Sequence, residues 1–149
     1  MDANDVQTMA DAYVTCALFT EQSELGIPER SGEFDSSPHI GRVTKDSKAM
    51  ALDLCTVFYH ANAADLADYP ADCAGHDLWY TRNGHGCGFW EADHCTKEEG
   101  ERLTSSAKRL GEAYMFKGKG GWIAFEDQRA ASARGLAERI ASNLAAQSK

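Results

Sequence analysis

The chain has 149 residues, the length of one domain, and a composition of 43% hydrophobic and 26% charged residues, which is typical of a folded globular protein. Its 15 basic and 23 acidic residues leave a net charge of -8, which argues against a basic surface that coats nucleic acid. No segment approaches the roughly 18 consecutive apolar residues of a membrane span, and the first residues lack the basic and apolar parts of a signal peptide. We therefore expect one domain over residues 1–149, located in the cytosol, with no membrane partner and no direct nucleic-acid contact.

Two helices and a long loop are predicted for the first part of the chain. Apolar residues recur at spacings of three and four over residues 6–19 and again over about 44–66, which is the pattern of an amphipathic helix. Pro70 prevents the second helix from continuing. Residues 22–43 hold two prolines, three glycines and few apolar residues, so we expect a mobile loop there.

Aromatic segments predict two β-hairpins in the second half of the chain. Residues 78–81 and 89–90 flank an Asn83-Gly84 pair, which readily forms a hairpin turn. Residues 113–116 and 122–125 flank a Lys-Gly-Lys-Gly-Gly turn. We expect the large aromatic side chains of both hairpins to form the core of the sheet.

A helix lies between the two hairpins, and another ends the chain. Thr96 and Glu99 form a capping box at the start of the first, and Gly111 is placed to end it. Residues 127–146 form an added C-terminal helix whose narrow apolar stripe can serve as the contact of a homodimer. The order α-α-β-β-α-β-β-α predicts a single α+β domain, with a small antiparallel sheet of two hairpins packed against helices.

Acidic residues are concentrated toward the amino terminus. Residues 1–80 hold 14 acidic and 4 basic residues, whereas residues 81–149 hold 9 acidic and 11 basic residues. Within residues 1–38, Arg30 is the one lysine or arginine, and the acids are Asp2, Asp5, Asp11, Glu21, Glu24, Glu29, Glu33 and Asp35. A field of one sign attracts a basic partner, so we expect these eight residues to be the partner-binding residues.

Histidines and cysteines in the middle of the chain raise the question of a metal site. A zinc site can be built from Cys73, His76, His85 and Cys87, because zinc prefers thiolate and imidazole ligands. Their spacing matches none of the standard zinc patterns, and the odd number of cysteines argues against a disulfide framework. We therefore expect no metal and no cofactor, with these four residues as weak metal candidates.

The polar cluster His76, Asp77, Arg82, Asn83 and His85 has two interpretations. In the first it is a ligand-binding or catalytic centre, with Cys87 or Cys95 as a nucleophile and a histidine as base. In the second it is structural, with Asn83-Gly84 in a turn and Arg82 paired with Asp77. No nucleophile elbow and no phosphate-binding glycine motif is present, which favours the structural interpretation and a protein that is not an enzyme.

The same segment carries a family resemblance. The stretch GHDLWYTRNGHG over residues 75–86, closed by GFW at 88–90, resembles the AGHDFWLTRNGHGAGFWD motif of a widespread family of small bacteriophage proteins. Weaker similarity covers Cys16–Phe19, Asn62–Leu66 and Arg102–Gly111, so the resemblance spans about residues 13–125. The resemblance implies a phage origin and no particular activity. Cys87 stands where the family has alanine and Cys95 has no counterpart, so it implies no thiol or metal chemistry.

Charge and resemblance together suggest a function. A small acidic phage protein with no enzyme motif fits an inhibitor that binds a host nucleic-acid-handling defence complex, of anti-CRISPR or anti-restriction type, in the host cytosol. The alternatives are a ligand-binding or catalytic domain centred on the histidine-containing cluster, and an accessory protein of virion assembly or host takeover.

Overall fold

In residues 1–27 and 37–147, which the computed structural model describes, helices and one β-hairpin form the α+β fold expected from the sequence. The helices are α1 (Ala3–Thr20), α2 (Ser37–Ile40), α3 (Lys45–Ala61), α4 (Ala71–Arg82), α5 (Lys97–Lys108) and α6 (Gln128–Gln147), and the strands are β1 (Tyr114–Lys117) and β2 (Ile123–Glu126). Short 3-10 helices are formed by Phe89–Glu91 and Lys119–Gly121.

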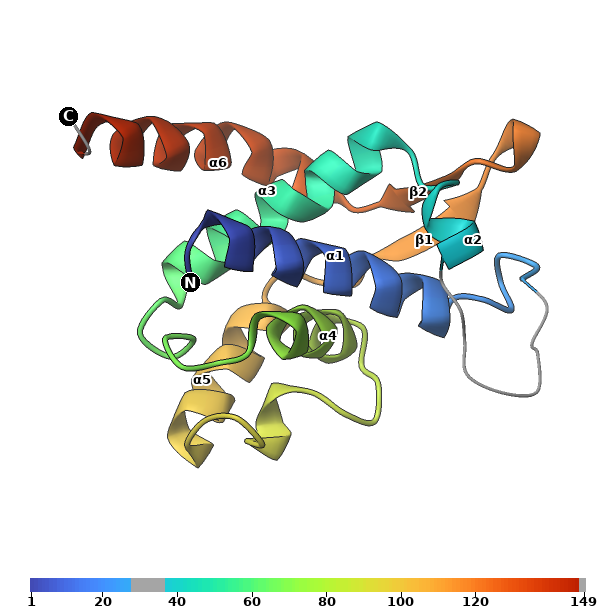
Figure 1. Ribbon diagram of the computed structural model, residues 1–149. Coiled ribbons are helices and arrows are strands. Elements are labelled where there is room, and N and C mark those ends of the chain that lie inside the picture. The colour runs from blue at the N-terminus through green and yellow to red at the C-terminus, as the bar shows by residue number, and fades with distance from the viewer. Residues whose placement is uncertain (28–36, 148–149) are drawn as a thin grey trace.

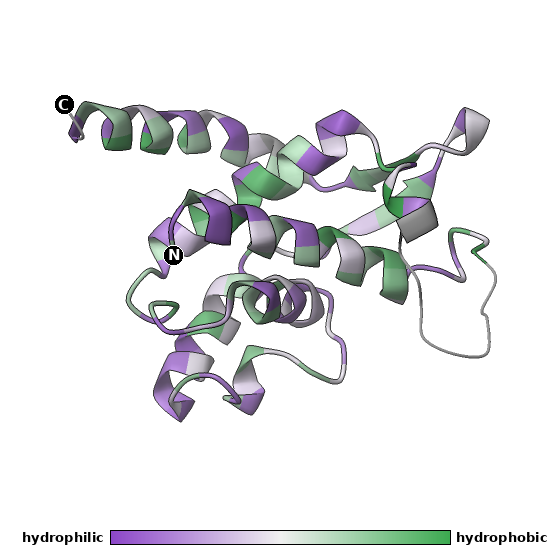
Figure 2. Cartoon of the chain, viewed as in Figure 1, coloured by the Kyte–Doolittle hydropathy of each residue, from purple (hydrophilic) through white to green (hydrophobic). Residues whose placement is uncertain are grey.

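Helix α1 runs through the middle of the molecule, with α3 and α6 on one side and α4 and α5 on the other (Figure 1). Its buried residues are Val6, Met9, Ala10, Ala12, Tyr13, Val14, Cys16, Ala17 and Leu18. A helix that buries residues on nearly every side is typical of a core element. Hydrophilic residues gather at the N-terminal end of α5, and others mark the exposed part of α1 (Figure 2).

Aromatic rings from three elements meet beside α1. Tyr13 packs edge-on against Trp79 with ring centroids 5.2 Å apart, and Phe125 lies 5.7 Å from Tyr13 and 5.8 Å from Trp79. All three are buried. The contacts join α1 to α4 and to β2, so this aromatic cluster fixes how the hairpin sits against the helices.

The local signals for α5 and for the second hairpin are confirmed. Thr96 accepts a hydrogen bond from the Glu99 amide, and Glu99 accepts one from the Thr96 amide, as in a capping box. Strands β1 and β2 pair antiparallel, from Tyr114 opposite Glu126 to Lys117 opposite Ile123. Patterns that depend only on neighbours in the chain therefore predict these elements correctly.

The predicted hairpin over residues 78–90 is wrong. Residues 78–81 belong to helix α4, and Phe89–Glu91 is a 3-10 turn. The Asn83-Gly84 pair ends α4 instead of turning a hairpin, with Gly84 at a φ of 69°. Burial explains the difference: Leu78 and Trp79 are fully enclosed, and packing against other helices outweighs the strand preference of aromatic residues.

Three further expectations need adjustment. Helix α3 ends at Ala61, before the predicted limit near residue 66. The predicted loop over 22–43 contains α2 and the buried residues Leu25 and Ile27, while its residues 28–36 lie outside the described part of the chain. Of the aromatic residues expected in the core, Trp90 and Trp122 have 40% and 52% of their surface exposed.

Helices α1 and α4 approach each other at a glycine. A β-carbon on Gly75 would lie 2.1 Å from the Met9 carbonyl oxygen and 2.9 Å from the Tyr13 amide nitrogen. Both atoms are backbone, so no rotation of a side chain can relieve the clash. The contact of α1 with α4 therefore requires glycine at position 75.

We expect Gly75→Ala to lower the free energy of unfolding by about 1–3 kcal/mol, or to prevent folding, because the methyl group forces the two helices apart. Gly135→Ala is the matched control, since a β-carbon at Gly135 in α6 meets nothing within 4 Å. That change should raise the free energy of unfolding by about 1 kcal/mol through helix propensity. Urea denaturation of both variants measures the difference, and equal effects at the two glycines would contradict the close approach.

Candidate functional site

The five polar residues of the central motif lie on α4 and the loop that follows it, and they divide into two groups. Arg82 and Asn83 are held by the core at the C-terminal end of α4. His76, Asp77 and His85 are half-buried and face outward. The structure therefore does not gather the five into one site.

The Arg82 side chain is completely buried, and each of its three guanidinium nitrogens donates at least one hydrogen bond. Its Nη1 donates to Asp127 Oδ2 at 2.6 Å and to the Tyr13 hydroxyl at 2.8 Å. Its Nη2 donates to Asp127 Oδ1 at 3.1 Å, and its Nε to the Gly111 carbonyl at 2.9 Å. The predicted pairing of Arg82 with Asp77 is wrong, because the counter-ion is Asp127 from the far end of the hairpin.

Asp127 and Asn83 extend this network into the backbone. Asp127 Oδ1 also accepts hydrogen bonds from the amides of Arg129 and Ala130, so the carboxylate caps the start of α6. Asn83 donates to the Trp79 carbonyl and accepts from the Ala113 amide. These contacts give both motif residues a structural role, as the structural interpretation of the sequence proposed.

We expect Asp127→Asn to lower the free energy of unfolding by about 3–5 kcal/mol, because it leaves the Arg82 guanidinium buried without a counter-ion. The double variant Arg82→Met/Asp127→Asn should recover part of that loss, since no unpaired charge remains. Arg102→Gln, at the exposed Arg102–Asp65 pair, controls for the loss of an ordinary ion pair and should change little. Chemical denaturation compares the variants, and a mild effect of Asp127→Asn would show that Arg82 finds another partner.

Asp77 is the centre of the outward-facing group. Its Oδ2 accepts a hydrogen bond from the Tyr69 hydroxyl at 2.5 Å, and the Tyr69 ring lies edge-on to the His94 ring with centroids 5.3 Å apart. Partial burial raises the pKa of Asp77 above the usual value, while the Tyr69 hydrogen bond and the nearby His94 and His76 act in the opposite direction. A carboxyl group and two imidazoles thus lie close to one another on this surface.

The cysteines near this surface do not form a metal site or an activated nucleophile. Among residues 1–27 and 37–147, no group of three or more His, Cys, Asp or Glu residues is placed to hold a metal ion. The four weak candidates Cys73, His76, His85 and Cys87 are therefore not gathered around a common centre. Burial is the main cause that raises the pKa values of Cys73, Cys87 and Cys95, which disfavours the reactive thiolate.

We expect the stability of the chain to depend on pH through Asp77. The pKa of Asp77 is raised in the folded state, so the folded chain holds the proton more tightly than the unfolded chain does. The contribution of Asp77 to the free energy of unfolding is therefore fully present at acidic pH and is lost as the pH rises through the folded pKa. Asp77→Asn is neutral throughout, so its free energy of unfolding relative to the parent should increase over the pH range that begins at about pH 4, the usual pKa of an aspartate. Urea titrations across this range test it, with Asp72→Asn as the exposed control. Parallel curves for Asp77→Asn and the parent would contradict the shift.

The described acidic residues predicted to bind a partner are distributed over α1 and the turn after it. Asp2 and Asp5 form a capping box at its start, and Asp11 is exposed and accepts from the Gln7 amide. Glu21 and Glu24 lie just beyond its end. Glu29, Glu33 and Asp35 fall outside the described residues. The five described acids are therefore spread along α1 and just beyond its end, and they do not form a compact patch.

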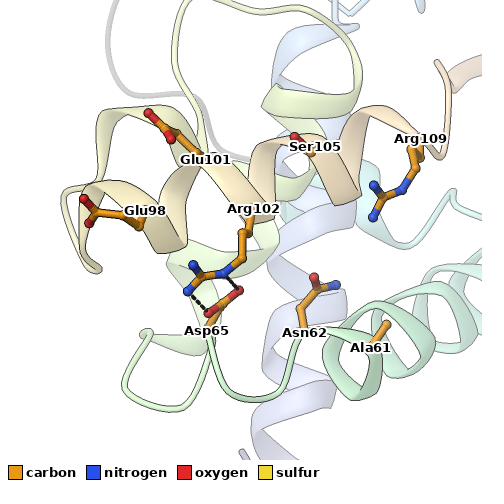
Figure 3. A pocket seen from close by; sticks show the side chains of 8 residues that line it. All are labelled: Ala61, Asn62, Asp65, Glu98, Glu101, Arg102, Ser105 and Arg109. Carbon is orange, nitrogen blue, oxygen red and sulfur yellow. Dashed lines mark hydrogen bonds and ion pairs between the residues drawn. The ribbon is translucent and has the colours of Figure 1, made fainter.

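A polar groove that sequence analysis missed lies between α5 and the loop after α3 (Figure 3). It has a volume of about 580 Å³. Arg102 crosses it and donates to both carboxylate oxygens of Asp65, at 2.9 and 2.7 Å. Asn62 is held by the Phe58 carbonyl and the Ser106 hydroxyl. The Arg102–Asp65 pair and the Asn62–Ser106 hydrogen bond thus fasten α5 to the end of α3 and the loop after it.

The second half of α6 extends away from the rest of the molecule (Figure 1). Ala130, Ala133 and Ala137 are buried, whereas Leu136 and Leu144 have 40% and 50% of their surface exposed. The exposed leucines are the part of the apolar stripe that remains available to another chain. A homodimer through this helix stays a prediction.

Comparisons of the chain with protein-family models, with curated proteins and with solved structures gave no match. Within the part of the chain that the structure describes, no helix combines the length and the apolar character needed to cross a membrane.

Proposed function

We propose that this chain binds a positively charged surface of a host nucleic-acid-handling defence complex through the acidic residues of α1 and of the turn after it, and thereby inhibits it. These residues are Asp2, Asp5, Asp11, Glu21 and Glu24. The resemblance of residues 75–90 to a phage family motif suggests the class of partner. The charge of α1 and of the residues after it suggests the mode of contact. The chain acts through protein-protein contacts, in the manner of anti-CRISPR and anti-restriction proteins.

The observation that carries the proposal is the lack of neutralising charge around these acids. In the described residues, the ion pairs of the chain use Asp65, Asp127 and Glu138, and none uses an acidic residue of 1–27. Residues 1–27 contain no lysine or arginine. Burial, and to a lesser extent the negative charge of Glu24, raise the pKa of Glu21, as expected for a carboxyl group with no base to offset its neighbour. Such a surface gains free energy when a basic surface covers it.

The dimensions of α1 favour an elongated binding site on the partner. A helix of 18 residues is about 27 Å long, and acidic side chains lie at both of its ends. A channel that holds a nucleic-acid backbone presents basic side chains over a comparable length. This spacing supports a nucleic-acid channel as the target more than a small basic pocket.

The alternative of a single catalytic or ligand-binding centre in the central motif has less support. Arg82 and Asn83 are engaged in the core, and His76, Asp77 and His85 remain without them. Replacing His76 and His85 by alanine should leave inhibition intact. The virion-assembly alternative would appear in copurification from infected cells, as recovery with particle proteins and not with a defence complex.

We expect Asp11→Lys/Glu24→Lys to weaken binding to the target complex by about tenfold or more and to abolish inhibition of its DNA cleavage. Both side chains are exposed and neither caps a helix, so the fold is retained. Glu101→Lys/Glu112→Lys makes the same change in net charge on another face and is the matched control. Purified CRISPR effectors and restriction enzymes form the test panel, with affinity measured over a salt series.

For the parent chain, affinity should fall as the salt concentration rises, because screening weakens contacts between exposed charges. Salt-independent binding, or equal losses in the two double variants, would contradict binding through the acidic residues of α1 and of the turn after it. Failure to bind any member of the panel would remove the defence complex as the target.

A further inference from the structure

Two basic side chains converge on a pocket at the tip of the hairpin, in a chain whose net charge is -8. The pocket has a volume of about 430 Å³, and its polar wall is formed by His39, Arg42 and Lys117. Leu25, Ile27 and Ile123 form its apolar wall. We call this the hairpin pocket.

Backbone hydrogen bonds bring Arg42 to the hairpin. The Ile123 amide donates to the Arg42 carbonyl at 2.8 Å, and the Thr44 amide donates to the Ile123 carbonyl at 2.9 Å. The segment before α3 thus adds to the edge of β2 as a short parallel bridge. Because this pairing is made by backbone atoms, the position of Arg42 beside the turn is built into the fold.

Arg42 and Lys117 meet above Gly121. A β-carbon on Gly121 would lie 3.7 Å from Arg42 Nη1 and 3.8 Å from Lys117 Cε. Gly121 has a φ of 79°, a conformation that side chains with a β-carbon rarely adopt. The glycine therefore permits the turn and leaves room for both long side chains on the same side.

No described carboxylate neutralises this pair. Among residues 1–27 and 37–147, neither Arg42 nor Lys117 takes part in an ion pair. Within the described part of the chain, the Arg42 guanidinium makes one hydrogen bond, to the Gly120 carbonyl at 3.4 Å, and its other donors meet no described acceptor. Glu21 and Glu24 precede the apolar wall in the chain and also pair with neither base. Two like charges held together repel each other, and a bound anion relieves that repulsion.

We propose that the hairpin pocket binds a small phosphorylated organic molecule, with its phosphate group between Arg42 and Lys117. A guanidinium beside an ammonium group suits phosphate, which accepts several charge-assisted hydrogen bonds at once. The apolar wall of Leu25, Ile27 and Ile123 then contacts the organic part of the ligand. The volume lies within the range of small-molecule sites.

Isotope-edited NMR on the full chain tests the proposal, with pyrophosphate, AMP and adenosine as probes. Pyrophosphate and AMP should shift the amide signals of Gly120 and Gly121, and adenosine should not, because it lacks the phosphate. AMP should bind more tightly than pyrophosphate if the apolar wall contributes. No shift with either phosphorylated probe at about 10 mM overturns the proposal.

Variants identify the residues responsible. Arg42→Ala and Lys117→Ala should each weaken binding about tenfold to a hundredfold, as expected for the loss of a hydrogen bond to a charged group. Both side chains are exposed, so the fold is retained, and circular dichroism checks it. Lys108→Ala removes an exposed charge from α5 and should bind as the parent does. If all three variants bind as tightly as the parent, or if all three lose affinity to the same extent, the signal comes from non-specific charge and the site is overturned.

Discussion

The buried ion pair of Arg82 and Asp127 is the constraint on which the arrangement of the helices depends. Its two side chains are 0% and 3% exposed, and taking them out of water costs several kcal/mol for each ion unless every polar atom finds a partner. The partners come from α1 through Tyr13, from the end of α5 through the Leu110 and Gly111 carbonyls, and from the start of α6. Moving any of these segments would leave a charge or a carbonyl unsatisfied, so the pair selects one relative placement of four parts of the chain.

The same pair explains why sequence analysis succeeds for some elements and fails for α4. The capping box of α5 and the turn of the second hairpin are determined by residues within a few positions of each other, and both are predicted correctly. The Trp-Tyr-Thr run and the Asn-Gly pair favour a strand and a turn locally. Contacts of Trp79 with Tyr13 and Phe125, and an ion pair between residues 45 positions apart, outweigh that preference. No local pattern contains that information.

The candidate sites show the same division between local and distant information. The acidic residues of α1 are visible in the sequence because they are concentrated in its first part with no lysine or arginine among residues 1–27, whereas the structure shows how they are spread along the helix. The hairpin pocket is not visible there, because 78 positions separate Arg42 from Gly120. The Lys-Gly-Lys-Gly-Gly turn was the available signal. The pocket also needs Arg42, which is brought beside this turn by the backbone hydrogen bonds of its segment with Ile123.

Asp127 both pairs with Arg82 in the core and caps the last helix. This combination limits how the chain can evolve. A terminal helix that only packs on the surface of a domain can be gained, shortened or replaced while the domain stays folded. Here the residue that caps the start of α6 is also the anion that the interior requires, so the beginning of the helix must be kept together with the interior. Residues 141–147 at the far end of the helix are exposed and are free to diverge in composition.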